Sequence, residues 1–268
     1  MWHKIIWISI PILFIIIYTI YAIFRPMPIL IPNISIPQNN TTTSISPPNF
    51  AWPQSGQQAI KLDGYSLLAT NGEQKQVPIA SIAKVMVALA VLEKKPLNIG
   101  EQGPEIIITS DNEALYIKYL NQGQSVVPVM AGVNINEYQA LQGLLLPSGN
   151  NMSNILAIWA FGSEQAYLDF ANSYAKKIGM QNTNFADTSG YSPNTVSTPQ
   201  DLLILGENAL QNPVIAEIVN QKSAVVPEAG TIANTNIDLG INGINGIKTG
   251  HTSKAGGCFL FSAQVNSL

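Results

Sequence analysis

The chain has 268 residues, with 13 lysines and arginines against 16 aspartates and glutamates, and a formal net charge of −3. This balance argues against nucleic acid as a partner, because nucleic-acid-binding proteins present basic surfaces. The single cysteine, Cys258, rules out an internal disulfide, and one cysteine with two histidines disfavours a conventional zinc site. We therefore expect neither a metal nor another cofactor. A Ser-His-Asp triad is also disfavoured, since only His251 lies away from the extreme N-terminus.

The first 55 residues have the composition of a membrane anchor followed by a linker. Residues 5–24, IIWISIPILFIIIYTIYAIF, carry no charge and have the length that spans a hydrocarbon core. This run is longer than the apolar region of a cleavable signal peptide, so we expect an uncleaved transmembrane helix within residues 1–24. Residues 25–55, rich in Pro, Asn, Thr and Ser, predict a semi-extended linker. We expect residues 56–268 to form the remaining, globular domain.

The beginning of that domain predicts strands and one apolar helix. Apolar runs on either side of the Asp-Gly pair at 63–64 predict a β-hairpin, and the Asn-Gly pair at 71–72 predicts a further turn. Residues 81–92 carry apolar side chains at helical spacing. The stretch EIIIT at 105–109 predicts a short strand.

From there to about residue 220 the pattern is mostly helical. Ser163 is expected to cap a helix that ends at residues 176–179, where two lysines precede Ile and Gly. Thr198 is expected to cap another helix, with proline at its first position. After Asn220 the signals return to strand, so the order strand, helices, strand predicts an α+β domain.

Three short motifs occur in order in this domain. SIAK stands at the start of the apolar helix, SGN between two apolar helical stretches, and KTG at the start of a late strand. Each is weak alone, since Ser173 and Lys176 repeat the first spacing. Together and in this order they are the signature of penicillin-binding proteins and serine β-lactamases. The candidate site residues are Ser81, Lys84, Ser148, Asn150, Lys248, Thr249 and Gly250.

The first and third motifs supply a nucleophile, a base and a cation. A serine hydroxyl needs a base to become a good nucleophile. On a helix, Ser81 and Lys84 share one face, and Lys84 can serve as that base if burial and the charge of Lys248 depress its pKa. The alternative is an ordinary N-cap serine, a solvated lysine and a strand-edge charge.

The remaining motif residues suit a peptide substrate with a free C-terminus. Ser148 can relay a proton to the leaving amine, and the Asn150 amide can hold the substrate backbone and Lys84. Lys248 and the Thr249 hydroxyl can bind a terminal carboxylate.

Residues 58–263 resemble the catalytic domain of the low-molecular-mass D-alanyl-D-alanine carboxypeptidases, serine peptidase family S11. The segments that carry the resemblance are VPIASIAKVM, LLLPSGNN, KKIGMQNTNFADTSGYS, STPQDL and NGIKTGHTSKAGG. The resemblance implies that Ser81 is acylated, that Lys84 is its base, and that the backbone N–H groups of Ser81 and His251 form the oxyanion hole. It also implies a β-lactamase/transpeptidase-like fold, a five-stranded antiparallel sheet flanked by helices, with a helical subdomain carrying Ser148.

The activity implied is removal of the terminal D-alanine from peptidoglycan stem peptides, at the outer side of the bacterial cytoplasmic membrane. β-Lactams would be covalent inhibitors. Two alternatives remain: a serine β-lactamase, although no glutamate lies between Glu164 and Glu207 to promote deacylation, and a non-catalytic module that binds β-lactams or cell wall.

The sequence departs from the family pattern at three places. Ala83 stands where threonine is usual and Asn151 where aspartate is usual. The resemblance also implies further strand and helix beyond Leu268, so we expect a sheet left incomplete and residues 51–268 to be marginally stable alone.

Overall fold

The computed structural model describes residues 18, 50–62 and 67–264. The chain divides into two units, residues 1–46 and 47–268, and the description below concerns the second. Apart from Tyr18, the expected anchor at residues 1–24 lies outside the described residues, as does most of the expected linker. Within the described ranges, no helix combines the length and apolar character needed to cross a membrane.

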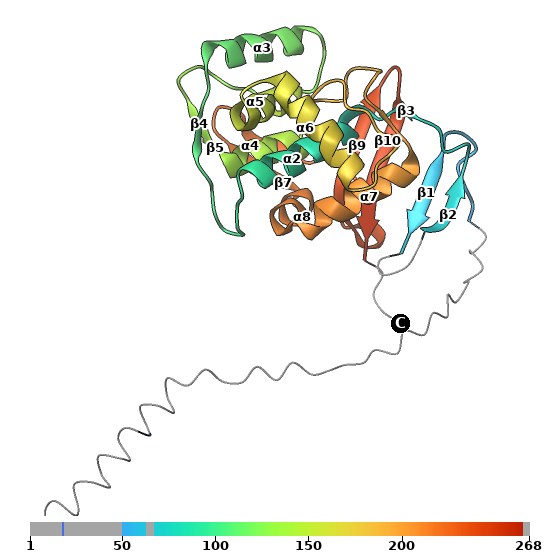
Figure 1. The fold of residues 1–268 in the computed structure, drawn as a ribbon. Helices are drawn as coiled ribbons and strands as arrows, with labels where there is room; N and C mark the ends of the chain where they lie inside the picture. Colours follow the sequence, from blue (N-terminus) through green and yellow to red (C-terminus); the bar gives the residue numbers. More distant parts are fainter. Residues whose placement is uncertain (1–17, 19–49, 63–66, 265–268) are drawn as a thin grey trace, which may run out of the picture. The chain divides into compact units, whose positions relative to one another are not determined.

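In the described part of the second unit, seven α-helices come between the N-terminal and the C-terminal strands along the chain, as the sequence pattern predicts (Figure 1). They are α2 (Ala83–Lys94), α3 (Ser110–Asn121), α4 (Glu137–Leu145), α5 (Asn150–Phe161), α6 (Glu164–Lys177), α7 (Pro199–Gln211) and α8 (Pro213–Val219).

Local signals place the ends of two of these helices where the sequence predicts them. The Ser163 hydroxyl accepts the Ala166 N–H at the start of α6, and Gly179 follows its end with a φ of +102°. The Thr198 hydroxyl likewise accepts the Asp201 N–H at the start of α7. Each bond satisfies a backbone donor that has no partner inside its helix.

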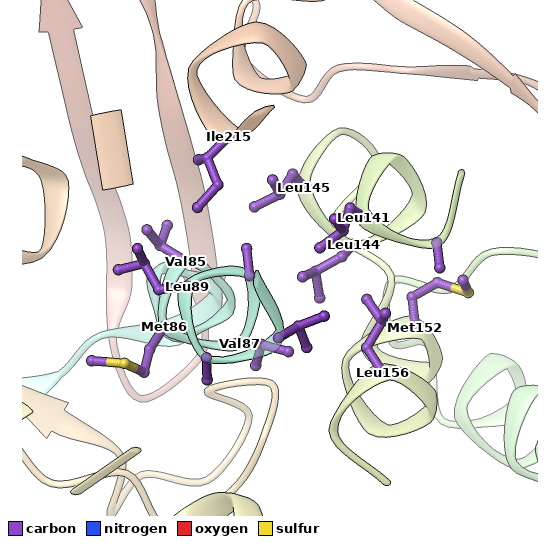
Figure 2. Packing of buried hydrophobic residues seen from close by; sticks show 14 of the residues in the cluster. Val85, Met86, Val87, Leu89, Leu141, Leu144, Leu145, Met152, Leu156 and Ile215 are labelled. Carbon is purple, nitrogen blue, oxygen red and sulfur yellow. The ribbon is translucent and has the colours of Figure 1, made fainter. Parts of the chain in front are cut away.

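Helix α2 is the centre of the hydrophobic core. All ten of its residues from Ala83 to Leu92 are buried, so it is enclosed by protein around its whole circumference, and all of them except Lys84 are apolar. Figure 2 shows its side chains facing Leu144 of α4, Leu156 of α5 and Ile215 of α8. A lysine in the first turn of such a helix is necessarily a buried lysine.

The strands of the described part pair as five two-stranded antiparallel sheets. The pairs are β1 (Gln58–Lys61) with β2 (Leu67–Asn71), β3 (Val77–Pro78) with β6 (Val196–Ser197), β4 (Glu105–Ile107) with β5 (Asn134–Asn136), β7 (Ser223–Val226) with β8 (Gly230–Ala233), and β9 (Ile244–Thr252) with β10 (Gly256–Ala263).

This pairing corrects the expectation of a single five-stranded sheet. Strand β10 forms its ladder with β9, and β1 forms its own with β2, but no ladder joins β10 to β1 among the described residues. Helix α7 packs against both β1 and β10 instead. The antiparallel sheets flanked by helices are therefore confirmed, whereas their continuity is not.

The β9–β10 hairpin lies on α7 through a close approach at Gly206. A Cβ at this glycine would lie 3.2 Å from methyl groups of both Ile247 and Leu260. The small residue thus lets the hairpin rest against the helix, and the long strand β9 runs on from there to the residues of the third motif.

Candidate active site

Ser81 does not lie in an α-helix, which corrects the predicted helix start. It occupies a short 3-10 turn, η1 (Ala80–Ile82), that leads directly into α2. Neither η1 nor α2 has a side-chain cap, so Ser81 is not an ordinary N-cap serine. Its Oγ instead accepts a hydrogen bond of 2.8 Å from Lys84 Nζ, so the predicted pair is formed.

Lys84 is fully buried, with 0% of its surface exposed. Besides Ser81 Oγ, its Nζ donates to the carbonyl oxygen of Ser189 at 3.0 Å. Burial holds the pKa of Lys84 well below its usual range, and the nearby charge of Lys248 lowers it further, while the Asp187 carboxylate acts in the opposite direction. A neutral amine at this position is able to take the Ser81 proton.

Lys248 is also buried, with 1% of its surface exposed, so it is not a solvated strand-edge charge. It lies at the middle of β9 rather than at the predicted strand start. Its Nζ donates to the Thr249 carbonyl oxygen at 3.1 Å, and burial lowers its pKa to about 7. Two lysine side chains thus interact in an environment from which water is largely excluded.

Gly250 lets β9 approach the turn that carries Ser81. A Cβ at Gly250 would lie 2.9 Å from the Ser81 backbone nitrogen and 3.1 Å from the Ala80 Cβ. A larger residue would therefore push the strand away from the nucleophile. His251 follows at once, with its side chain exposed, so its contribution at this place is its backbone rather than its imidazole.

The second motif stands between α4 and α5, the interhelical position that the sequence predicts. Ser148 is 5% exposed, its Oγ has no hydrogen-bond partner among the described residues, and its φ is +66°. Gly149 donates to the Gly143 carbonyl, which folds the loop back over the end of α4. A buried hydroxyl that is held in a left-handed conformation without a partner is free to bond a ligand or a reacting group.

The side chain of Asn150 hydrogen-bonds a residue other than the predicted Lys84. Its Nδ2 donates to Gln124 Oε1 at 2.6 Å and its backbone N–H to the Ser125 carbonyl at 2.8 Å. Within residues 67–264, no hydrogen bond joins its side chain to Lys84, so that part of the prediction is wrong in this structure. Gln124 and Ser125, which the sequence did not single out, are the hydrogen-bond partners of Asn150 in place of Lys84.

Asn151 shows why an amide stands where aspartate is usual in the resembled family. Its Oδ1 accepts the Val127 N–H at 2.9 Å, and its Nδ2 donates to the Val127 carbonyl at 2.8 Å. A carboxylate has no proton to donate and could make only the first of these bonds.

Thr235 and Ser189 also belong to the site, although the sequence did not single them out. The Thr235 and Thr249 hydroxyls are 2.7 Å apart, and the Thr235 N–H donates to the Leu146 carbonyl, which ties the third motif to the loop of the second. Ser189 acts through its backbone carbonyl, which any residue possesses, so no residue type could have marked it. For Thr235, the only signal in the sequence was its position a short distance before the KTG motif.

Comparisons with known proteins identify the family of this chain. The family model described as D-alanyl-D-alanine carboxypeptidase, peptidase family S11, matches residues 54–268. The D-alanyl-D-alanine carboxypeptidase DacA of Escherichia coli (strain K12) is 28% identical over 214 residues, which cover 76% of this chain and 51% of that protein. The D-alanyl-D-alanine carboxypeptidase DacB2 of Mycobacterium tuberculosis is 30% identical over 209 residues, which cover 75% of this chain and 67% of that protein.

The fold is similar to that of a solved transpeptidase. The Streptomyces K15 DD-transpeptidase superposes with a TM-score of 0.70 and 25% identity, over 79% of this chain and 85% of that chain. The chain spans about half the length of DacA. Because the family model covers residues 54–268, the chain belongs to the S11 family of D-alanyl-D-alanine carboxypeptidases.

Proposed function

We propose that this chain is a serine D-Ala-D-Ala carboxypeptidase that removes the terminal D-alanine of peptidoglycan stem peptides through an acyl-serine intermediate. One observation carries the proposal: a fully buried lysine, Lys84, hydrogen-bonds the Ser81 hydroxyl beside a second buried lysine. Burying two lysine side chains costs free energy, and such a cost is typical of catalytic sites.

In the proposed reaction, Ser81 Oγ attacks the carbonyl carbon of the penultimate D-alanine while neutral Lys84 takes its proton. The backbone N–H groups of Ser81 and His251 stabilise the oxyanion, at the place where Gly250 brings β9 against η1. Lys84 returns this proton through the Ser148 hydroxyl to the nitrogen of the leaving D-alanine as the peptide bond breaks. Water then attacks the acyl-enzyme and restores the Ser81 hydroxyl.

The terminal carboxylate of the substrate binds at the third motif. Protonated Lys248 supplies a positive charge, and the Thr249 hydroxyl donates a hydrogen bond. The Asn150 amide binds the substrate backbone once it exchanges Gln124 for the ligand. β-Lactams mimic the peptide and acylate Ser81.

We further propose that the enzyme acts in the bacterial envelope. The uncharged stretch at residues 5–24 serves as the anchor, residues 25–55 as the linker, and residues 56–268 as the catalytic domain on the outer side of the membrane. Support comes from the apolar composition of the first segment and the cell-wall substrate that the site fits.

Ser81→Ala tests the proposal, with Ser173→Ala as a matched control. Ser173 precedes Lys176 by the same spacing but lies exposed on α6. Three quantities are measured: D-alanine release from diacetyl-Lys-D-Ala-D-Ala, hydrolysis of a β-lactam, and covalent labelling by fluorescent penicillin. We expect Ser81→Ala to lose all labelling and D-alanine release, and Ser173→Ala to keep both.

Other outcomes separate the alternatives. Rapid β-lactam hydrolysis without D-alanine release would indicate a β-lactamase, and labelling without turnover of either substrate would indicate a binding module. Labelling of Ser81→Ala would refute the assigned nucleophile. Lys84→Ala should slow acylation by about 10²–10⁴-fold, the usual worth of a general base.

A further inference from the structure

Lys84 is held from two sides, and only one of its partners is a motif residue. Ser81 Oγ lies 2.8 Å from its Nζ, and the Ser189 carbonyl oxygen lies 3.0 Å away, 105 residues further along the chain. A long lysine side chain has many rotamers, so the second contact decides where the amine stands. The residues that hold the Ser189 carbonyl in place therefore also determine the position of the Lys84 amine.

The segment around Ser189 is a turn organised by one carboxylate. Asp187 accepts five hydrogen bonds: from the backbone N–H groups of Ser189 at 3.3 Å, Gly190 at 3.1 Å and Tyr191 at 2.9 Å, and from the hydroxyls of Ser189 at 2.7 Å and Thr195 at 2.5 Å. Charge-assisted bonds of this kind are stronger than neutral ones. The turn is thus built around the charge of Asp187.

This turn rests directly on the residue before the nucleophile. Gly190 has a φ of +76°, and a Cβ there would lie only 1.8 Å from the Ala80 carbonyl oxygen, so the site accepts no larger residue. At the other end of the turn, the Thr195 carbonyl accepts the Ile79 N–H at 3.2 Å. Both ends therefore tie the turn to the chain that carries Ser81.

We propose that Asp187 is a positioning residue for Lys84: its carboxylate fixes the turn whose Ser189 carbonyl holds the lysine amine beside Ser81. Its charge also acts on Lys84 directly, in the direction opposite to that of Lys248. The inference rests on the proposed function, because it concerns the base of the acylation step. It adds a residue outside the three motifs.

Other titratable groups share the environment of Lys84 and Asp187. Lys248 is the second cation that acts on Lys84. Tyr119 and Tyr167 also sense Asp187, together with Glu164, but burial is the main cause that raises the pKa of both phenols above 10. Both phenols therefore stay neutral in an assay between pH 5 and 9, and the pH effect expected of Asp187 is its effect on Lys84.

Replacing Asp187 by asparagine separates charge from geometry, because the amide keeps one acceptor oxygen and the same size. Without the negative charge, the protonated form of Lys84 loses a favourable interaction, and the pKa of Lys84 falls. Acylation requires the neutral amine, so the acidic limb of the pH–rate profile should move to lower pH. Asp187→Ala, which also releases the turn, should slow acylation by up to about 100-fold.

The experiment measures the rate of acylation by fluorescent penicillin between pH 5 and 9 for the full chain and each variant. Asp201→Asn is the control, since Asp201 is buried and accepts hydrogen bonds from Asn182 and Thr183 but does not act on Lys84. We expect it to leave the acidic limb unmoved.

The outcomes are distinguishable. An acidic limb of Asp187→Asn that coincides with that of the unaltered protein overturns the inference, whether or not the rate falls, because a purely structural loss lowers the rate equally at all pH values. Failure of the unaltered protein to become labelled would instead overturn the proposed function. A shifted limb in Asp187→Asn with an unshifted Asp201→Asn supports the inference.

Discussion

Lys248 should make the reaction sensitive both to pH and to the charge on the substrate's C-terminus. Burial lowers the pKa of Lys248 to about 7, so its side chain is charged below that pH and increasingly neutral above it. A terminal carboxylate pairs only with the charged form. We therefore expect KM for a free-acid peptide to rise as the pH increases through about 7, whereas KM for the amidated peptide should not follow this titration.

Lys248→Ala gives the corresponding mutational test. Loss of a charged hydrogen bond should lower kcat/KM on the free-acid peptide by roughly 10–100-fold and on the amidated peptide much less. Lys254→Ala, an exposed lysine between β9 and β10, is the control for loss of a positive charge. Equal losses on both peptides would show that Lys248 acts through Lys84 and not on the substrate.

At the scale of the element, the first residue of α4 should make stability fall as pH rises. Glu137 is 0% exposed, neither of its oxygens has a hydrogen-bond partner among the described residues, and burial raises its pKa from 4.5 to about 7. The folded state therefore holds a proton that the unfolded state releases between these pH values. Its stabilising contribution is full below about pH 4.5 and is lost as the pH rises through about 7.

Glu137→Gln should remove this dependence. The free energy of unfolding of the unaltered protein should fall by at most roughly 3 kcal/mol over that window, and the variant should show a flatter profile. Urea unfolding at several pH values measures this difference. Glu164→Gln, at the same first position of α6, controls for loss of a carboxylate at a helix start. Parallel profiles for Glu137→Gln and the unaltered protein would contradict the prediction.

At the scale of the whole molecule, the β9–β10 hairpin presents an apolar surface to solvent. Phe259 and Phe261 stack with ring centroids 5.2 Å apart and are 43% and 51% exposed. They lie on β10, whose second edge pairs with no strand in the described part of the chain. An exposed aromatic patch beside an unpaired strand edge favours association between molecules.

We therefore expect a Phe259→Thr, Phe261→Thr double variant of residues 47–268 to aggregate less than the unaltered segment, as measured by light scattering during heating. Labelling by fluorescent penicillin should persist, because the site residues are unchanged. Ile237→Thr is the control, since Ile237 is 88% exposed but lies in the loop after β8. Equal aggregation of the double variant and the unaltered segment would refute this prediction.

The sequence by itself determined the helices with clear end signals and the residues of the three motifs. Ser163 and Thr198 cap their helices because a cap bond joins residues only two or three positions apart. The contact of Ser81 with Lys84 is equally local, three positions along the chain. Interactions of such short range follow from residue type and spacing.

Only the tertiary structure decided what these residues can do. Ser173 and Lys176 have the same spacing but lie exposed on α6, whereas burial in the core depresses the pKa of Lys84. Two contacts join segments that are distant in sequence: Asn150 with Gln124, and Lys84 with the Ser189 carbonyl. The lack of a ladder between β10 and β1 among the described residues also depends on the folded arrangement. The pattern of side chains along the sequence does not indicate which backbone groups come into contact after folding. In this protein such a contact, with the Ser189 carbonyl, positions Lys84.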